Sequence, residues 1–239
     1  MTLNITEKLI QRQINHWNQF REFLRDEEDQ PTAPPGPVIT ISRQAGSGGR
    51  TLATGLAERF ELSLQDHSIV ERIARDRNLE TSFVDQLDEH AINQAELWIK
   101  GVFNKRIFLK DEYHKALVTV ITRLAAGGGV VFLGRGAHLI LGEKATLRVR
   151  VVAEQATRLA RIMERTGLSR AEARALLAET DRNREDFIHK VFKVEASDPG
   201  NYDLVLNSDR TKPECMLEIV SLALIGARTG GRARMHSQV

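Results

Sequence analysis

A short β-branched run that leads into a glycine-rich turn is the feature that most limits how this chain can fold. Residues 38–41 read Val-Ile-Thr-Ile, and glycines follow at positions 46, 48 and 49. A segment compatible with a helix then runs from Thr51 to Phe60. A strand, a glycine turn and a helix in this order open a parallel α/β sheet. We therefore predict an α/β fold whose first strand is 38–41.

Further apolar runs complete this sheet. Short strands are predicted at 62–65, 130–133, 146–153 and 202–206. Apolar residues three and four positions apart predict helices in the segments 67–126, 154–166, 169–194 and 213–227. At 239 residues the chain suits one sizeable α/β domain. We expect residues 37–227 to form a doubly wound three-layer α/β sandwich with approximately five parallel strands.

The two ends of the chain differ from this domain. Apolar residues at Ile10, Ile14, Trp17, Phe20 and Leu24 predict an amphipathic N-terminal helix within 1–36, followed by a proline-rich linker. This helix is either an arm folded back on the domain or a contact in a homo-oligomer, because its apolar stripe must be buried. The basic tail 228–239 is expected to be disordered.

Composition excludes several classes of protein. The net charge is only +2, so bulk electrostatics do not favour nucleic acid as a partner. No signal-peptide core is present, and the longest near-apolar run, 217–227, is shorter than a membrane span. These features predict a cytoplasmic protein that does not contact membranes. The single cysteine, Cys215, forms no intrachain disulfide and is expected to be half-buried.

The glycine turn has the chemistry of a phosphate site. Glycines let backbone N–H groups approach an anion, and the following helix adds its positive dipole end. The candidate phosphate-binding residues are Gly46, Ser47, Gly48, Gly49, Arg50 and Thr51. In the pattern G-x-x-x-x-G-K-[ST], Arg50 replaces the lysine, and Thr51 is the candidate magnesium ligand. A plain tight turn between strand and helix is the alternative.

An ordered set of motifs resembles the cytidylate kinase-like family. Residues 41–50 read Ile-Ser-Arg-Gln-Ala-Gly-Ser-Gly-Gly-Arg, which is similar to the loop signature I-S-R-x-x-G-S-G-G-R of that family. The resemblance continues in order over about 37–227, through Asp66, Gly134-Arg135-Gly136, Arg158, Arg161, Asp181, Arg184, Asn201-Tyr202-Asp203-Leu204 and Asn207. It implies phosphoryl transfer from ATP, with Mg²⁺, to a nucleoside monophosphate, with CMP or dCMP favoured.

The resemblance also implies roles for these residues. Arg50, Arg158 and Arg184 are the candidate catalytic residues, and Thr51 is the metal ligand. The candidate acceptor-binding residues are Asp66, Arg135, Arg161 and Asp181. Residues 67–126 correspond to a helical acceptor-binding insert, and 154–195 to a lid. The structural alternatives are a turn with a surface arginine for Arg135, a helix cap for Asp66, and helices with solvated ion pairs for the others.

Two other functions remain open on the sequence. The long segment 67–126 is compatible with a P-loop kinase for a different small acceptor. The missing lysine is compatible with a protein that binds ATP or ADP as a signal and does not catalyse. The histidines at 67, 90, 114 and 138 lack metal-ligand spacing, and we expect them at the surface or an interface.

Overall fold

A five-stranded parallel sheet forms the centre of the protein. The computed structural model describes residues 36–66 and 112–229. The strands are β1 (Val38–Arg43), β2 (Ser63–Asp66), β3 (Val130–Leu133), β4 (Leu147–Val152) and β5 (Leu204–Asn207). Their order in space is β2-β3-β1-β4-β5, and all neighbouring pairs are parallel. The predicted parallel α/β sheet is therefore confirmed.

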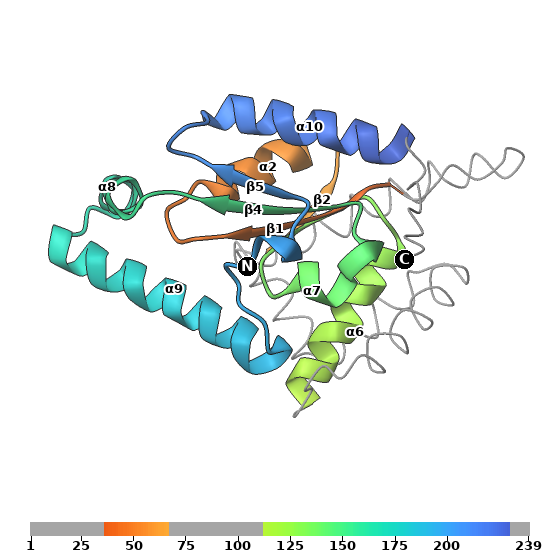
Figure 1. Cartoon of the computed structure of the whole chain (residues 1–239), viewed down its shortest axis with the longest axis horizontal. Helices are drawn as coiled ribbons and strands as arrows, with labels where there is room; N and C mark the ends of the chain where they lie inside the picture. The colour runs from red at the N-terminus through yellow and green to blue at the C-terminus, as the bar shows by residue number, and fades with distance from the viewer. Residues whose placement is uncertain (1–35, 67–111, 230–239) are drawn as a thin grey trace, which may run out of the picture.

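Helices cover both faces of this sheet, as Figure 1 shows. Helices α2 (Gly49–Arg59) and α10 (Pro213–Thr229) lie on one face, and α6 (Glu112–Ala126) and α7 (Ala137–Leu141) lie on the other. Short 3-10 turns, η1 (Gly142–Lys144) and η2 (Pro199–Asn201), precede β4 and β5. The three-layer sandwich is thus confirmed.

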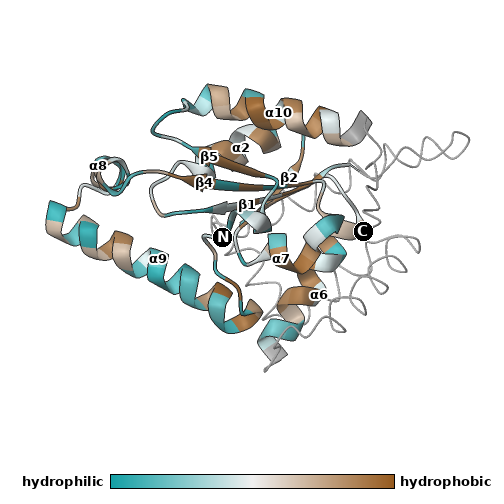
Figure 2. Ribbon diagram, viewed as in Figure 1, coloured by the Kyte–Doolittle hydropathy of each residue, from teal (hydrophilic) through white to brown (hydrophobic). Residues whose placement is uncertain are grey.

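Alternation along the strands divides the core in two. Ile39 and Ile41 of β1 pack with Leu56 of α2 on one face. Val38, from the same strand, packs with Ile121 of α6 on the other face. Because both faces of the central strands are covered, the buried residues of β1 and β3 are mostly apolar, whereas β4 also carries Arg148 and Arg150 and shows teal between brown in Figure 2.

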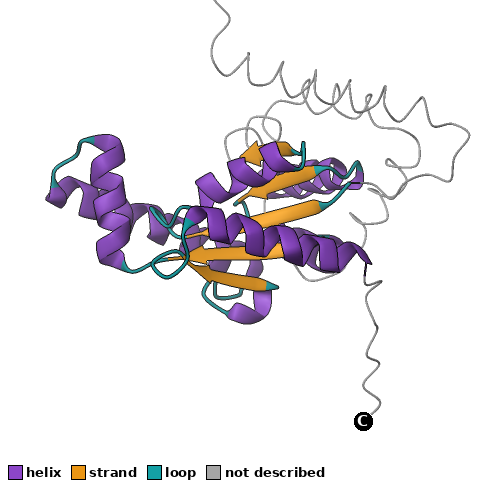
Figure 3. Cartoon of the chain, turned by 90° about the horizontal axis from the view of Figure 1, so that it is seen from above, coloured by secondary structure: helices purple, strands orange, loops and turns teal. Residues whose placement is uncertain are grey.

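Two helices extend beyond the carboxyl ends of the strands. Helix α8 (Gln155–Thr166) and helix α9 (Arg170–Phe192) project together from the sheet (Figure 3). Gly167, in a left-handed conformation, ends α8, and a capping box of Ser169 and Glu172 begins α9. The two helices share a small apolar core with Ala45, formed by Leu159, Ile162, Ala173 and Leu177.

Some expectations on element boundaries and exposure change. The first helix begins at Gly49, two residues before the predicted Thr51. The last strand begins at Leu204, because Tyr202 closes the turn η2 and its backbone N–H donates to the carbonyl of Pro199. The prediction for Cys215 is wrong, because this residue is exposed on α10.

Other expectations fall on parts that the structure leaves out. The end of the predicted insert 67–126 is α6, which packs on the sheet, and 67–111 lie outside the described residues. The N-terminal segment 1–35 and the end of the tail, 230–239, also lie outside them. Among the described helices, none has the length and apolar character needed to cross a membrane.

Candidate functional site

The glycine loop lies where the strand order reverses. The chain leaves β1 for one edge of the sheet, through β2 and β3, and later builds the other edge with β4 and β5. Ligands of open parallel sheets bind at the carboxyl ends of the strands next to such a reversal. The loop 44–48, between β1 and α2, occupies this position.

The loop has a backbone that requires glycine. Gly46 and Gly48 have φ values of 73° and 86°, in the left-handed region. A Cβ atom on Gly46 would lie 2.6 Å from the carbonyl oxygen of Arg158. The loop therefore approaches α8 more closely than any side chain would allow.

Most N–H groups of this loop are open. Ala45 donates to Asp181 Oδ1 at 2.7 Å, and Ser47 donates to the Gln44 carbonyl at 3.4 Å. Within the described residues, no protein acceptor takes the N–H groups of Gly46, Gly48, Gly49, Arg50 and Thr51. Because these groups stand at the N-terminus of α2, they form a site for an anion.

Two cavities meet beside the loop. The larger, about 870 Å³, lies between the loop, α2 and the α8–α9 pair. The smaller, about 240 Å³, lies between α9 and the residues that end β1 and β3. They share the wall formed by Arg43, Gln44, Thr180 and Arg184. Two ligands, one in each cavity, would therefore face each other across two arginines.

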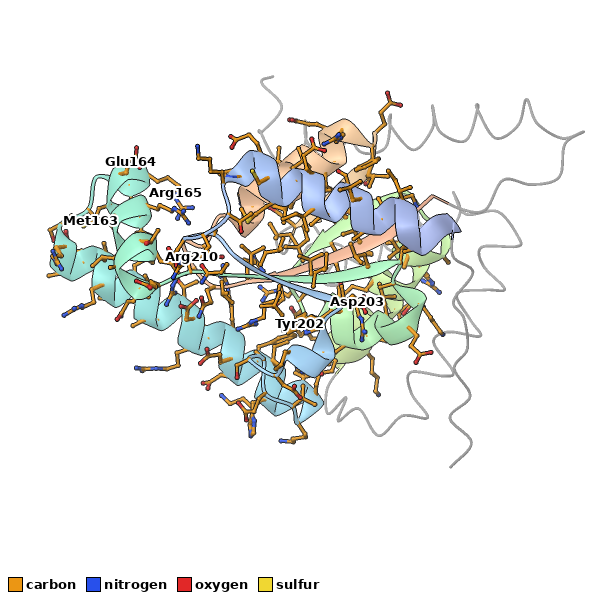
Figure 4. All side chains as sticks on the ribbon, turned by 45° about the horizontal axis from the view of Figure 1, so that its top comes forward. Met163, Glu164, Arg165, Tyr202, Asp203 and Arg210 are labelled. Atoms are coloured by element: carbon orange, nitrogen blue, oxygen red, sulfur yellow. The ribbon has the colours of Figure 1, made fainter. Side chains whose placement is uncertain are left out.

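Positive charge accumulates around the larger cavity. Its arginines are Arg43, Arg50, Arg161, Arg165 and Arg184. Arg165 extends from α8, the helix above the loop (Figure 4). Burial, followed by the charges of Arg184, Arg50 and Arg135, lowers the pKa of Arg43 to about 9. Burial also lowers the pKa of Arg184, although Asp181 opposes this shift. An anion bound here would relieve this repulsion.

Arg158 of α8 and Asp181 of α9 hold the loop in place through hydrogen bonds and an ion pair. Arg158 is only 7% exposed and donates through Nε to the carbonyl of Ala153 at 3.0 Å and through Nη1 to that of Ala45 at 3.3 Å. Its guanidinium also forms an ion pair with Asp181, whose other oxygen holds the Ala45 N–H. These contacts fix α8 and α9 to the loop.

Arg161 and Arg184 connect the projecting helices to the sheet. Arg161 donates to the hydroxyl and the carbonyl of Ser208, at 2.8 and 3.1 Å, and its Nη1 lies 3.5 Å from the carbonyl of Gly46. Arg184 donates to the carbonyl of Arg43 at 3.2 Å. Both side chains line the larger cavity.

Arg50 and Thr51 stand on the first turn of α2. Arg50 Nη2 lies 3.0 Å from Asp66 Oδ2, and 55% of the Arg50 side chain is exposed. Asp66, at the end of β2, thus holds an arginine beside the larger cavity. Thr51 is exposed and lines the same cavity.

Arg135 follows β3 in a strained backbone conformation. Its φ is 53°, and Gly134 and Gly136 on either side also have positive φ. The guanidinium lies over the ring of Phe187 on α9, 5.7 Å from the ring centroid. Arg135 forms part of the wall of the smaller cavity.

Four residues that line the cavities were not predicted as site residues from the sequence. Arg43 was part of the recognised motif, although no role was given to it. Arg165 follows Arg161 by four positions, and this spacing places both on one helical face. Arg150 belongs to a strand read only as apolar. His138 was expected at the surface or an interface, but it is buried within the domain: it is 3% exposed and stacks on Tyr202, with ring centroids 4.8 Å apart.

The larger cavity fits a magnesium ion carried by phosphates. Mg²⁺ keeps several waters and takes few protein ligands when it binds with a nucleotide. Thr51 offers one hydroxyl there. Elsewhere in the described residues, no cluster of three His, Cys, Asp or Glu side chains forms a separate metal cage.

The sheet order, the open amide loop and the arginines define a P-loop kinase. The model of the Cytidylate kinase-like family matches residues 38–210. The chain therefore belongs to the cytidylate kinase-like family, and the resemblance stated above is confirmed.

Individual relatives agree with this family. A cytidylate kinase of Pyrococcus horikoshii is 28% identical over 189 residues, which cover 78% of this chain and 88% of that protein. A uronate isomerase of Corynebacterium glutamicum is 36% identical over 97 residues, but the match covers 40% of this chain and only 19% of that protein. The structure of an uncharacterised protein from Eubacterium ventriosum has a TM-score of 0.56 and 19% identity, and the match covers 79% and 98% of the two chains. It shows a shared fold.

Proposed function

We propose that this protein transfers the γ-phosphoryl group of ATP to a nucleoside monophosphate, with CMP or dCMP as the favoured acceptor. The observation that carries the proposal is the pair of adjoining cavities beside the open amide loop. Phosphoryl transfer requires donor and acceptor phosphates in line and in contact. The preference for cytidine nucleotides rests on the family and on relatives named cytidylate kinase.

The larger cavity would hold ATP. The open N–H groups from Gly46 to Thr51 would donate to the polyphosphate, with the dipole of α2 adding positive potential. Thr51 would supply its hydroxyl to Mg²⁺, which when bound neutralises charge on the donor phosphates. Arg50, held by Asp66, would replace the missing lysine as a permanent charge at the cavity edge.

The smaller cavity would hold the acceptor. Arg43 and Arg184 line both cavities, so they would contact phosphate groups of both nucleotides. Arg135 would hold the phosphate of the acceptor from the opposite wall. Such cations stabilise the charge that spreads over the transferred group. A phosphate acceptor is already ionised at neutral pH, so no general base is needed.

The other arginines and Asp181 would take indirect roles. The polar atoms of Arg158 and Asp181 bind to backbone groups of Ala45 and Ala153 and to each other. We therefore assign them positioning roles, in place of the catalytic and substrate-binding roles that the motif suggested. Arg161 spans from the loop to Ser208, and we assign it to the lid contact over the donor.

The α8–α9 pair would act as the lid. It carries arginines to the wall of the larger cavity. Closure over both nucleotides would exclude water that otherwise hydrolyses the donor. The domain bounds 37–227, with an insert from 67 and a lid at 154–195, belong to the same proposal, as does a cytoplasmic location.

A substrate panel tests this function. The full chain is incubated with ATP, with and without Mg²⁺, and with CMP, dCMP, UMP, AMP or non-nucleotide acceptors, and ADP release is measured. We expect Mg²⁺-dependent turnover that is highest with CMP or dCMP. Turnover of a non-nucleotide, with none on CMP, UMP or AMP, would establish a kinase for another small acceptor.

A nucleotide-sensing protein is the second candidate. The Arg50–Asp66 pair favours it, because this arginine, which stands in place of the lysine, is engaged by a carboxylate. Calorimetry separates the two functions. Tight binding of ATP without turnover on any acceptor would establish the sensor, and the N-terminal segment would then be the element that passes the signal or joins two copies.

A further inference from the structure

The floor of the smaller cavity contains a buried cation. Arg150 of β4 lines this cavity but not the larger one, and it is only 6% exposed. In the sheet register, Arg150 lies opposite Ser42 of β1. The residue after Ser42 is Arg43, which belongs to the wall between the cavities. A charged group therefore stands inside the sheet layer, directly beneath the proposed acceptor.

The position of Arg150 is fixed by neutral groups. Its Nη1 donates to Ser42 Oγ at 3.3 Å and to the Tyr202 hydroxyl at 3.2 Å, and its Cζ lies 5.5 Å from the centroid of the Tyr202 ring. The Tyr202 hydroxyl donates to the carbonyl of Ala196 at 2.8 Å, so its oxygen is left to accept from Arg150. Tyr202 lies just before β5 (Figure 4), and His138 stacks on its ring.

Arg150 has no carboxylate partner among the described residues, whereas Arg148 on the same strand is paired with Asp203. Arg148, two residues earlier on the same strand, forms two hydrogen bonds with Asp203, at 2.6 and 3.2 Å. Among the described residues, Arg150 pairs with no carboxylate, and its Nε and Nη2 donate to no protein acceptor. Burying a guanidinium without such partners is costly. A ligand in the cavity can supply the missing acceptors.

We propose that Arg150 determines acceptor specificity by donating to two adjacent acceptor atoms at the end of the acceptor remote from its phosphate. This inference rests on the proposed function. If the acceptor phosphate lies at Arg43 and Arg184, the base extends toward Arg150, which lines only the smaller cavity.

The fork of donors in a guanidinium matches cytosine. The O2 and N3 atoms of cytosine are neighbouring acceptors, whereas N3 of uracil carries a hydrogen and would face an N–H donor. A good bidentate contact of an arginine with a base discriminates by ~1–3 kcal/mol, which corresponds to a selectivity on the order of 10- to 100-fold. Arg150 thus selects cytosine over uracil in this cavity.

The test compares CMP and UMP in two matched variants of the full chain. Arg150→Met removes the guanidinium donors while keeping an unbranched, apolar stem, and Arg148→Met makes the same change on the same strand outside the cavity. We expect Arg150→Met to lower kcat/KM for CMP, mainly through KM, by on the order of 10- to 100-fold, and to change UMP much less. Arg148→Met should keep the CMP-to-UMP ratio. An unchanged ratio in Arg150→Met would overturn the proposal.

Binding measurements separate this inference from the proposed function. Calorimetry with CMP and UMP is run on the wild type, Arg150→Met and Arg150→Lys, and thermal melting confirms that each variant is folded. Arg150-dependent CMP binding without turnover supports the inference and rejects the kinase function. Turnover of CMP with equal CMP binding in Arg150→Met rejects the inference alone. The absence of CMP binding in the wild type overturns it as well.

Discussion

At the residue scale, the arginines fall into two groups according to whether an aspartate pairs with them. Arg158 and Arg148 are each neutralised by an aspartate, and their contacts hold elements together. In the described part of the chain, Arg43 and Arg150 form no ion pair, although both are largely removed from solvent. An uncompensated guanidinium beside a cavity costs stability in the free protein and becomes favourable when an anion or strong acceptor binds.

Arg184 is the residue whose loss should affect transfer most directly. It lines both cavities and lies against the backbone of Arg43. We expect Arg184→Ala to reduce kcat by roughly 10²–10³-fold, as removal of one charge-stabilising donor does elsewhere. Arg182→Ala is the control, because Arg182 is exposed on the same helix and lines neither cavity. Equal rates in both variants would remove Arg184 from the site.

His138 should make stability depend on pH. Burial, with the charges of Arg150 and Arg148, lowers the pKa of His138 to about 3, so the folded protein keeps it neutral. The unfolded chain binds a proton near pH 6.5, and stability therefore falls as the pH drops from about 6.5 toward 3. At pH 5 the loss from this group is about 2 kcal/mol. Denaturant unfolding should show a flatter profile for His138→Phe, and an identical slope would contradict this account.

At the scale of elements, the loop depends on close contact with α8. The left-handed Gly46 lies against the Arg158 carbonyl, and Arg158 in turn reaches the Ala45 carbonyl and Asp181 of α9. The loop, α8 and α9 are therefore one connected unit, although they are far apart in the sequence. A change in this loop should therefore alter the position or mobility of α8 and α9.

Gly46→Ala tests this unit. The new Cβ would lie 2.6 Å from the Arg158 oxygen, at a φ of 73° that costs an L-residue about 1–2 kcal/mol. We expect ATP affinity to fall at least ~10-fold, with faster amide exchange in α8, because the loop must move away. Gly226→Ala is the control. Gly226 is an exposed position of α10, a Cβ there meets nothing within 4 Å, and alanine favours a helix. An unchanged ATP affinity in Gly46→Ala would refute this mechanism.

The whole molecule brings two cavities together around one wall. The strand order puts β1 next to both β3 and β4, so residues from the ends of β1 and β3 and Arg150 of β4 meet α9 around the smaller cavity. Each cavity by itself would hold one nucleotide. Arg43 and Arg184 line both cavities and would contact both ligands in the proposed transfer.

A ligand that spans both cavities tests this arrangement. We expect adenosine and cytidine joined 5′ to 5′ through five phosphates to bind at least ~100-fold more tightly than ATP, because the second contact becomes intramolecular. Calorimetry measures this difference, with adenosine pentaphosphate as the control that lacks the cytidine. Equal affinity for the two compounds would show that the smaller cavity does not take the acceptor base.

Local patterns were enough to predict the loop, the five strands and the family. A β-branched run, glycines and helical periodicity act over a few residues, so the positions of Gly46 to Thr51 and of most helices follow from the sequence alone. Only the tertiary structure decided which arginines are neutralised. Arg158 meets Asp181 while Arg43 and Arg150 are left without a carboxylate, and His138 is buried. These outcomes depend on burial and on contacts between residues distant in sequence, which periodicity and spacing do not encode.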